Sequence, residues 1–306
     1  MSSSARVAVV VVAYNSADVL PGLLESLDDG MAGTDWGLVV ADNDSSDGSP
    51  EVVERLRPDA TVVRTGRNGG YAAGINAGVV AAGECEAVLI LNADVRLTPG
   101  CAQILFGALR PGVGIVAPRL LDATGDLIPS IRREPTLARA MADSLIGASR
   151  AGWSRRFGEV ATDPSEYTDR HAIDWAEGST LMLSTHCLQE IGPWDESFFL
   201  YSEETDFALR ANDAGFSVLY VPEARAVHLQ GGSAGSASLW PLLVSNRWRL
   251  YRKRHGRVAS AAFWGALALR EGTRALRGGA ANKAALSYLL SGERMRERPG
   301  PHSIGP

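Results

Sequence analysis

The sequence has 306 residues, of which 45% are hydrophobic and 21% charged, and it carries a formal net charge of -5 at pH 7. This composition is typical of a folded protein with a sizeable core, and it excludes disordered, collagen-like and coiled-coil chains. The longest apolar runs, residues 7–13 and 258–269, are shorter than the roughly 20 residues of a membrane-spanning helix. The N-terminus lacks a secretory signal and the three cysteines lack a C-x-x-C spacing, so we expect a cytoplasmic chain without a disulfide framework.

The charge is unevenly distributed along the chain. Residues 247–298 contain 13 Lys and Arg against 3 Asp and Glu, a balance of +10, which leaves 17 against 32, or -15, for the remainder. The sequence therefore predicts an acidic body over residues 1–238 and a basic, mostly helical C-terminal region over residues 239–306.

The first 120 residues alternate short β-branched runs with segments of helical length, which indicates a mostly parallel sheet with crossover helices. Strands are expected at residues 7–13, 38–41, 61–64, 87–91 and 114–117. Polar residues follow four of these runs. Because the carboxyl ends of parallel strands share one edge of a sheet, we expect a ligand crevice at that edge.

The remaining elements are predicted by the same patterns. Residues 119–172 look irregular and are interpreted as an insertion or lid. Strands are expected at 173–183, 217–221 and 226–228, and helices at 185–191, 203–214, 239–255, 259–277 and 281–290.

Two polar motifs follow the first two strands. The first strand delivers Ala13, Tyr14 and Asn15 to the crevice, although a helix N-cap at Asn15 is the simpler interpretation of that residue alone. Asp42 and Asn43 follow the second strand, where a carboxylate accepts hydrogen bonds from a base or ribose. An Asx-rich turn is the structural alternative.

A glycine-rich segment opens at Asn68 and Gly70 and runs through Asn76 into a helix. Bare backbone amides at a helix N-terminus favour a diphosphate. A dinucleotide site is the rival interpretation, but its glycine fingerprint belongs after the first strand, where this chain has Ala-Tyr-Asn-Ser.

The most hydrophobic strand ends in Asn92, Ala93 and Asp94. An aspartate there offers the oxygen ligands that a hard divalent cation prefers, and capping of the next turn is the alternative. His228 ends a later strand and is either a metal or phosphate ligand or an ordinary hydrogen-bonding histidine.

Three carboxylates, Glu203, Glu204 and Asp206, begin a helix directly after an aromatic-rich stretch. Apolar surroundings raise the pKa of a carboxylate toward a value useful for a general base. Stabilisation by the helix dipole is the structural interpretation.

The basic helix around residues 246–256 interleaves arginines with aromatic residues. We expect no nucleic acid partner, because no recognised binding module surrounds it. Two interpretations of residues 239–290 stay open: an interfacial surface attracted to anionic lipid, and helices that pack their apolar sides on the body.

In this order the motifs between residues 7 and 255 resemble the GT-A-fold nucleotide-sugar glycosyltransferases, in particular the inverting family 2 and its bacterial rhamnosyltransferase-like branch. The resemblance implies an α/β fold with a Rossmann-like, mostly parallel central sheet flanked by helices, followed by a helical C-terminal extension. It also implies transfer of a sugar from a nucleoside diphosphate to an acceptor hydroxyl.

The resemblance implies a role for each motif residue. The nucleotide sugar is bound by Ala13, Tyr14, Asn15, Asp42, Asn43, Asn68, Gly70, Asn76, Asn92 and Ala93. Mg²⁺ or Mn²⁺ is held by Asp94, in the family's Asp-x-Asp motif whose first position is here Asn92, and by His228, in a His-x-x-Gly-x-Ser pattern completed by Gly231 and Ser233. Glu204 is the expected base, with Glu203 and Asp206 as alternatives, and the acceptor side carries Trp175, Gly178 and Asp195.

The expected donor is a dTDP- or UDP-linked sugar, with rhamnose as a candidate, and the expected acceptors include lipid-linked ones of the cell envelope and glycosylated metabolites. Peripheral contact with the inner face of the membrane through residues 239–290 and a homodimer are further expectations. Two other functions are alternatives: a non-catalytic nucleotide-sugar-binding protein, and a nucleotide-sugar pyrophosphorylase. The latter needs a glycine-rich basic loop after the first strand, which this sequence lacks.

Overall fold

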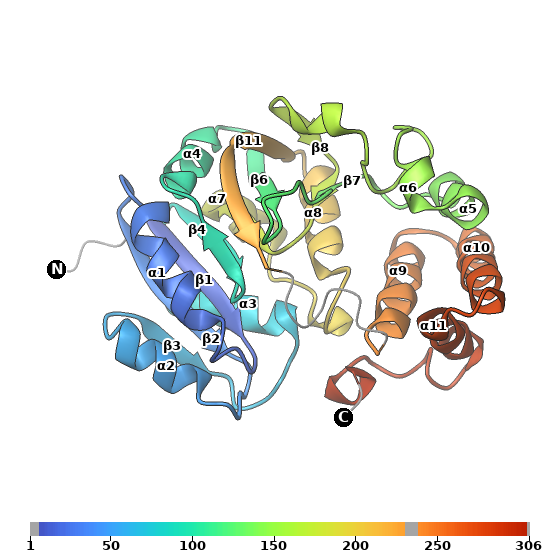
Figure 1. The fold of residues 1–306 in the computed structure, drawn as a ribbon, viewed down its shortest axis with the longest axis horizontal. Helices are drawn as coiled ribbons and strands as arrows, with labels where there is room; N and C mark the ends of the chain where they lie inside the picture. Colours follow the sequence, from blue (N-terminus) through green and yellow to red (C-terminus); the bar gives the residue numbers. More distant parts are fainter. Residues whose placement is uncertain (1–5, 230–237, 305–306) are drawn as a thin grey trace.

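The computed structural model of the protein describes residues 6–229 and 238–304. Its main feature is a nine-stranded sheet in the order β3-β2-β1-β4-β10-β6-β11-β5, with β8 paired to β11 (Figure 1). The strands are β1 (Val7–Ala13), β2 (Trp36–Asp42), β3 (Thr61–Arg64), β4 (Ala87–Asn92), β5 (Val95–Leu97), β6 (Val113–Leu121), β7 (Ile131–Arg132), β8 (His171–Ile173), β9 (Trp175–Ala176), β10 (Thr180–Ser184) and β11 (Ser217–His228).

The helices are α1 (Leu20–Gly30), α2 (Ser49–Leu56), α3 (Tyr71–Ala82), α4 (Cys101–Ala108), α5 (Leu137–Ile146), α6 (Ala148–Ala151), α7 (Thr185–Ile191), α8 (Glu203–Asp213), α9 (Trp240–Arg254), α10 (Arg257–Leu276) and α11 (Ala280–Leu290). Short 3₁₀ turns lie at η1 (Pro164–Tyr167), η2 (Glu196–Phe198) and η3 (Pro301–Ile304).

The sheet is mostly parallel. Strands β3, β2, β1 and β4 pair in parallel, β10 is antiparallel to both β4 and β6, and β11 runs parallel to β6. Six strands therefore share one direction, while β5, β8 and β10 oppose it. The predicted α/β class with a central sheet and flanking helices is confirmed.

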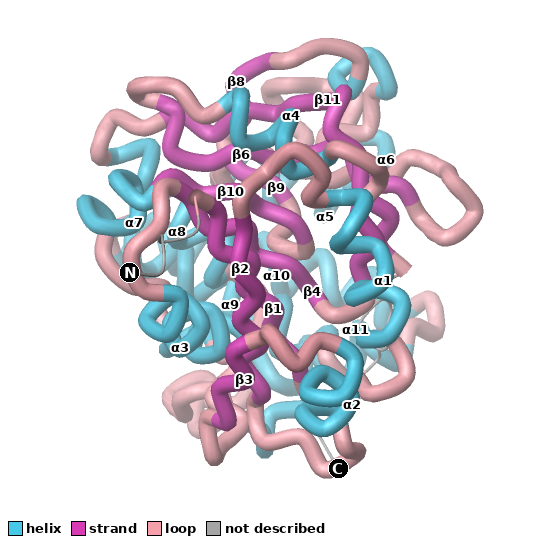
Figure 2. Tube along the Cα trace, turned by 90° about the vertical axis from the view of Figure 1, so that its left-hand side faces the viewer, coloured by secondary structure: helices cyan, strands magenta, loops and turns pink. Residues whose placement is uncertain are grey.

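The sheet is covered by helices on both faces because β1 is apolar at every position (Figure 2). Its alternate residues Val7, Val9 and Val11 pack with α1, α2 and α4, and the residues between them pack with α3, α7 and α8. Helix α3 lies very close to β1, since a Cβ on Gly78 would stand only 2.3 Å from a methyl group of Val10. This close packing fixes the N-terminus of α3 at the carboxyl edge of the sheet.

Several predicted boundaries are wrong, for identifiable reasons. Residues 119–172 are not irregular throughout, because they contain the ten-residue helix α5. The strand expected over residues 173–183 is divided into β8, β9 and β10, which pair in different places. The two strands expected over residues 217–228 are the single strand β11, whose register shifts between Val221 and Arg225. The three-residue strand β5 was not predicted.

The C-terminal helices form a bundle with α5, on the right of Figure 1. The apolar face of α10 lies inside this bundle, where Phe263 and Leu267 are buried. Basic side chains of the bundle pair with acidic ones elsewhere in the chain, as in the contacts of Arg247 with Glu159 and of Arg254 with Asp213. The buried apolar side chains of this region pack within the bundle and against α5, as the packing interpretation expects, whereas Val258, Leu276 and Leu290 are exposed. In the described part of the chain, no helix combines the length and hydrophobicity needed to cross a bilayer.

Candidate active site

The predicted polar clusters meet at the carboxyl edge of the sheet. In the strand registers, Ala13 stands beside Asp42 and Val12 beside Asn92. Because β10 is antiparallel to β4, the segment before it reaches the same edge, where the Asn92 amide donates to the carbonyl of Ser179 at 2.9 Å. The expected crevice is therefore formed by residues from distant parts of the chain.

The end of β2 offers an open acceptor. Asp42 is buried, and its Oδ2 accepts a hydrogen bond from the Ser45 amide at 3.1 Å, while its Oδ1 is buried without a partner. Nearby, Asn15 Oδ1 accepts from the Ser46 amide at 2.9 Å, and Tyr14 is largely exposed. A buried acceptor without a donor is costly, so Asp42 is the residue here most suited to receive a hydrogen bond from a ligand.

Other predicted ligand residues hold the crevice together. Asn43 is buried. Its side-chain amide donates to the carbonyl of Gly70 at 2.9 Å, and its backbone amide donates to the carbonyl of buried Ala13. Asn68 Oδ1 accepts from the Gly70 amide at 3.1 Å. Asn76 exchanges hydrogen bonds with the backbone of Trp194 at 2.9 and 3.0 Å. These side chains fix the loops around the site.

Asp94 and His228 form the predicted cation site. The carboxylate Oδ1 of Asp94 lies 3.3 Å from Nε2 of His228, and the other ring nitrogen of His228 lies 2.9 Å from Oε1 of Glu177. Burial by itself would lower the pKa of His228, but these two carboxylates raise it to about 9. The short strand β5, paired with β11, places the two residues together.

This pair fits a divalent cation. Adjacent ligands on a six-coordinate ion with bonds of about 2.1 Å stand about 3 Å apart, close to the observed separation of Asp94 Oδ1 and His228 Nε2. A carboxylate beside the second ring nitrogen is the usual arrangement for a metal-binding imidazole. Within residues 6–229 and 238–304, no group of three His, Cys, Asp or Glu side chains could hold an ion. The pair therefore suits a cation that takes its other ligands from phosphate and water.

The loop that leads into α8 has an unusual backbone. Phe199, Tyr201 and Ser202 have positive φ angles of 61°, 69° and 76°, a conformation that non-glycine residues rarely adopt. The loop is held from both sides. The Tyr71 amide donates to the Phe199 carbonyl at 2.8 Å, and the side-chain amide of buried Asn246 on α9 contacts three loop carbonyls at 2.6 to 3.2 Å.

Gly70 is required by the same contact. Its φ is +87°, and a Cβ there would stand 2.0 Å from the Phe199 carbonyl oxygen. Strain of this kind persists only where surrounding structure enforces it, and it is concentrated at functional sites.

The three carboxylates after this loop differ sharply. Asp206 is 1% exposed, and its two oxygens accept from Lys253 Nζ at 2.6 Å and Arg210 Nε at 2.9 Å. Glu203 is buried and Glu204 is partly exposed, and each has an Oε2 without a hydrogen-bond partner. Burial raises the pKa of Glu204 to about 7, and burial beside Glu204 raises the pKa of Glu203 well above its usual range.

Tyr71 lies close enough to these carboxylates and to Asp94 to be affected by the charges of both. Its hydroxyl donates to the carbonyl of Gly178 at 3.0 Å. Its pKa is raised well above the ordinary value by burial and by the negative charges of four carboxylates, which are Glu203, Glu204, Asp94 and Glu177. The predicted base and the predicted metal ligand therefore act electrostatically on one ring.

The three acceptor-side predictions are placed differently. Gly178 contacts the base region, because a Cβ there would stand 3.1 Å from Glu204 Cβ. Trp175 is a core residue, 8% exposed, whose Nε1 donates to the Arg133 carbonyl at 3.1 Å. Asp195 accepts from Lys253 Nζ at 2.7 Å. Burial opposes its ionisation, but Lys253 and Ser197 lower its pKa to about 2.

Tyr71, Glu177 and Asn246 were not selected from the sequence. Glu177 lies between the predicted residues Trp175 and Gly178 but has no distinguishing pattern of its own, and Asn246 lies within the basic helix. Gly231 and Ser233, which complete the histidine pattern, lie outside the described residues.

Comparison with known proteins gives a consistent result. A model of the family described as glycosyl transferase family 2 matches residues 8–158, and a model of glycosyl transferase family group 2 matches residues 87–249. Among curated relatives, an N-acetylglucosaminyl-diphospho-decaprenol L-rhamnosyltransferase of Mycobacterium tuberculosis is 29% identical over 243 residues, 74% of this chain and 77% of the relative. The low-salt glycan biosynthesis hexosyltransferase Agl10 of Haloferax volcanii is 27% identical over 226 residues, 72% of this chain and 66% of the relative.

Among solved structures, the mannosyltransferase PcManGT from Pyrobaculum calidifontis, in complex with GDP-Man and Mn²⁺, aligns with a TM-score of 0.55 at 17% identity. The alignment covers 94% of this chain and 86% of that one. This likeness supports the fold described above.

The clamp on the strained loop makes a first prediction. We expect Asn246→Ala to lower the free energy of unfolding by about 1 to 3 kcal/mol, because three carbonyls of the loop lose their donor. Gln189→Ala, an exposed amide on α7, is the control and should change it by less than about 0.5 kcal/mol. Urea denaturation measures both, and equal effects of the two substitutions would contradict the clamp.

Proposed function

The chain belongs to the family 2 glycosyltransferases, and we propose that it transfers a sugar from a nucleoside diphosphate to an acceptor hydroxyl with inversion at the anomeric carbon. The observation that carries this proposal is the partly exposed carboxylate of Glu204, whose Oε2 has no hydrogen-bond partner in the described part of the chain and whose pKa is raised by burial. Gly178 lies beside it, and the charges of both Glu204 and Asp94 act on Tyr71. A base and a cation site in one crevice are what in-line displacement of a nucleoside diphosphate needs.

The donor is proposed to lie along the carboxyl edge of β1, β2 and β4. Asp42 would accept a hydrogen bond from the nucleobase. Tyr14 and Asn15 are exposed and Asn92 is partly exposed at the same edge. The backbone at Asn68 and Gly70 leads into the N-terminus of α3, which favours a diphosphate.

Asp94 and His228 are the residues that would hold a divalent cation, Mg²⁺ or Mn²⁺. When bound, such a cation supplies positive charge that stabilises the departing nucleoside diphosphate. Glu177 orients the imidazole through its contact with Nδ1 of His228.

Glu204 is proposed as the base, because the other two carboxylates are less suited. Asp206 has both oxygens occupied by hydrogen bonds from Arg210 and Lys253, so neither oxygen is open to an acceptor hydroxyl. Glu203 is 2% exposed, so an acceptor hydroxyl has little access to it. Glu204 combines access to solvent with a pKa of about 7, near the value that makes a carboxylate an effective base at neutral pH.

The mycobacterial relative is named for transfer of L-rhamnose to N-acetylglucosaminyl-diphospho-decaprenol. By this likeness we propose a dTDP-rhamnose donor, with UDP-sugars as alternatives, and a lipid-linked acceptor in cell-envelope biosynthesis. A lipid-linked acceptor would bring the chain to the inner face of the cytoplasmic membrane, and the exposed apolar side chains Val258, Leu276 and Leu290 in residues 239–290 support contact there. The homodimer stays an expectation from the sequence.

The donor and the cation are tested together. Across a panel of nucleotide sugars that includes dTDP-rhamnose, we expect release of nucleoside diphosphate with Mn²⁺ or Mg²⁺ and none with EDTA. Asp94→Asn should lower this release by about a hundredfold or more, since metal stabilisation of the leaving group is worth several kcal/mol. Asp59→Asn, which changes an exposed carboxylate between α2 and β3, is the control. Full release in EDTA, or in Asp94→Asn, would refute the cation site.

The base is tested by three substitutions. Glu204→Gln should lower kcat by about two to four orders of magnitude while donor affinity is kept. Glu203→Gln should retain kcat within about tenfold. Asp206→Asn should mainly lower stability, because Lys253 and Arg210 lose the negative charge between them. The largest loss of kcat in Glu203→Gln, with Glu204→Gln near normal, would reassign the base.

A further inference from the structure

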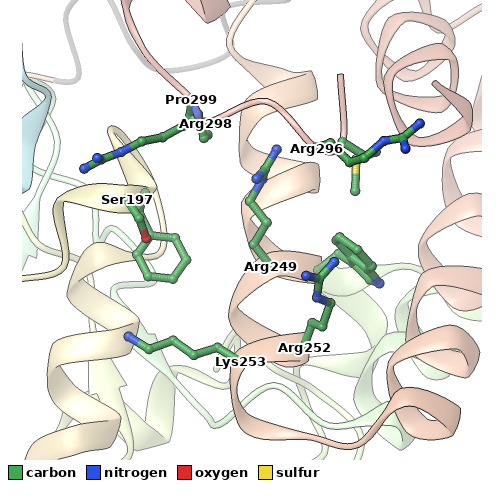
Figure 3. Close-up of a pocket in the computed structure, with 10 residues that line it drawn as sticks. Ser197, Arg249, Arg252, Lys253, Arg296, Arg298 and Pro299 are labelled. Atoms are coloured by element: carbon green, nitrogen blue, oxygen red, sulfur yellow. The ribbon is translucent and has the colours of Figure 1, made fainter. Parts of the chain in front are cut away.

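A cavity of about 610 Å³ lies between α9 and the C-terminal segment 295–299 (Figure 3). Arg249, Arg252 and Lys253 line it from α9, and Arg296 and Arg298 line it from the C-terminal segment. No carboxylate lines this arginine pocket. Four of these side chains, Arg249, Arg252, Arg296 and Arg298, give the cavity a positive potential, because the charge of Lys253 is balanced by Asp195 and Asp206.

The cations of α9 divide into two groups. Those turned toward the rest of the chain are neutralised: Arg247 by Glu159, Lys253 by Asp195 and Asp206, and Arg254 by Asp213.

The four arginines of the pocket have no ion pair in the described part of the chain. Arg249 donates to the carbonyls of Arg294 and Glu297, Arg296 donates to that of Gly292, and Arg252 stacks over Trp248. Uncompensated guanidinium groups held this way are arranged to receive an anion, and arginine is the preferred partner of phosphate oxygens.

The pocket is also partly apolar. Phe198, Trp248 and Met295 line it beside the arginines. This lining suits a phosphate ester with an organic substituent better than a fully hydrated inorganic ion.

The pocket adjoins the proposed active site. Its wall includes Lys253, which donates to Asp195, predicted on the acceptor side, and to Asp206 on the first turn of the helix that carries Glu204. Arg298 and Pro299 also line an adjoining cavity of about 380 Å³, which is lined as well by Glu196 and reaches Asn68 and Phe199. An acceptor bound in the arginine pocket can therefore extend toward the site.

We propose that the arginine pocket binds the diphosphate of the acceptor, so that the acceptor class is a sugar carried on an organic diphosphate ester. The inference rests on the proposed transfer reaction, but the affinity of the pocket for diphosphate does not depend on it. The same chemistry is presented by anionic phospholipid headgroups, and the experiment separates the two sources.

The first measurement is a calorimetric titration of the full chain with inorganic pyrophosphate in EDTA. We expect Arg298→Gln, an exposed side chain with no hydrogen bond in the described structure, to weaken binding about tenfold, and Arg252→Gln/Arg298→Gln about a hundredfold. Arg277→Gln, exposed on the end of α10 and outside the pocket, is the charge-matched control and should bind as the unchanged protein does. A thermal melt of each variant verifies its folding.

The second measurement is flotation with vesicles of three parts phosphatidylcholine to one part phosphatidylglycerol. Loss of pyrophosphate binding in the arginine variants, with vesicle binding equal to that of Arg277→Gln, supports the proposal. Absent pyrophosphate binding in the unchanged protein, equal binding in all variants, or a loss seen only with vesicles overturns it. Failure of the transfer reaction itself would appear separately, as absent nucleoside diphosphate release from every donor.

Discussion

The geometry of the site depends on the backbone of residues 199–202, which is held between α3 and α9 with positive φ angles at Phe199, Tyr201 and Ser202. Gly70 permits the contact on one side because any side chain there would collide with the Phe199 carbonyl. Asn246 secures the other side by bonding the carbonyls of the loop. The start of α8, and with it Glu203 and Glu204, is positioned by this double constraint. The C-terminal bundle is therefore part of the architecture of the site.

The carboxylates at the start of α8 show how local pairing assigns different roles to neighbouring residues. Asp206 ties α8 to α9 through Lys253. Glu204 lies two positions earlier, has an Oε2 without a hydrogen-bond partner in the described part of the chain, and has a pKa raised by burial. A paired acid and an unpaired acid within one helical turn can therefore serve as a structural link and as the proposed proton acceptor, respectively. The same contrast separates the neutralised cations of α9 from those of the arginine pocket.

Much of the fold was predictable, because it follows from continuous apolar runs. Strands β1 and β3 have the predicted bounds, and β2 and β4 extend past theirs by one or two residues. The convergence of Asp42, Asn92 and Asp94 followed from the rule for parallel strand ends. Helix α5 was missed because its burial depends on α10, more than a hundred residues away, so its short sequence has no strong local signal. Strand β11 was predicted as two strands because its middle, between Val221 and Arg225, interrupts the apolar pattern and shifts the register with β6.

The division of roles within the site was not predictable from the sequence. The sequence offers Glu203, Glu204 and Asp206 as three candidate bases. The contacts of Asp206 with Arg210 and with Lys253, about fifty residues later, separate it from the other two. Trp175 was predicted on the acceptor side, and its burial identifies it as a core residue. Asn76 has the expected spacing, but its partners on the Trp194 backbone come from a distant segment. Residue types and spacing located the site, and long-range packing determined what each residue does in it.

The central claim is that Glu204 removes the acceptor proton, and the pH dependence of kcat/KM tests it most directly. Because a base acts in its deprotonated form, kcat/KM should rise about tenfold per pH unit below about 7 and level off above it, in line with the raised pKa of Glu204. In Glu204→Gln the residual kcat/KM should no longer rise with pH below about 7. A flat profile between pH 5 and 8 in the unchanged protein, or the same rise in Glu204→Gln, would contradict the account.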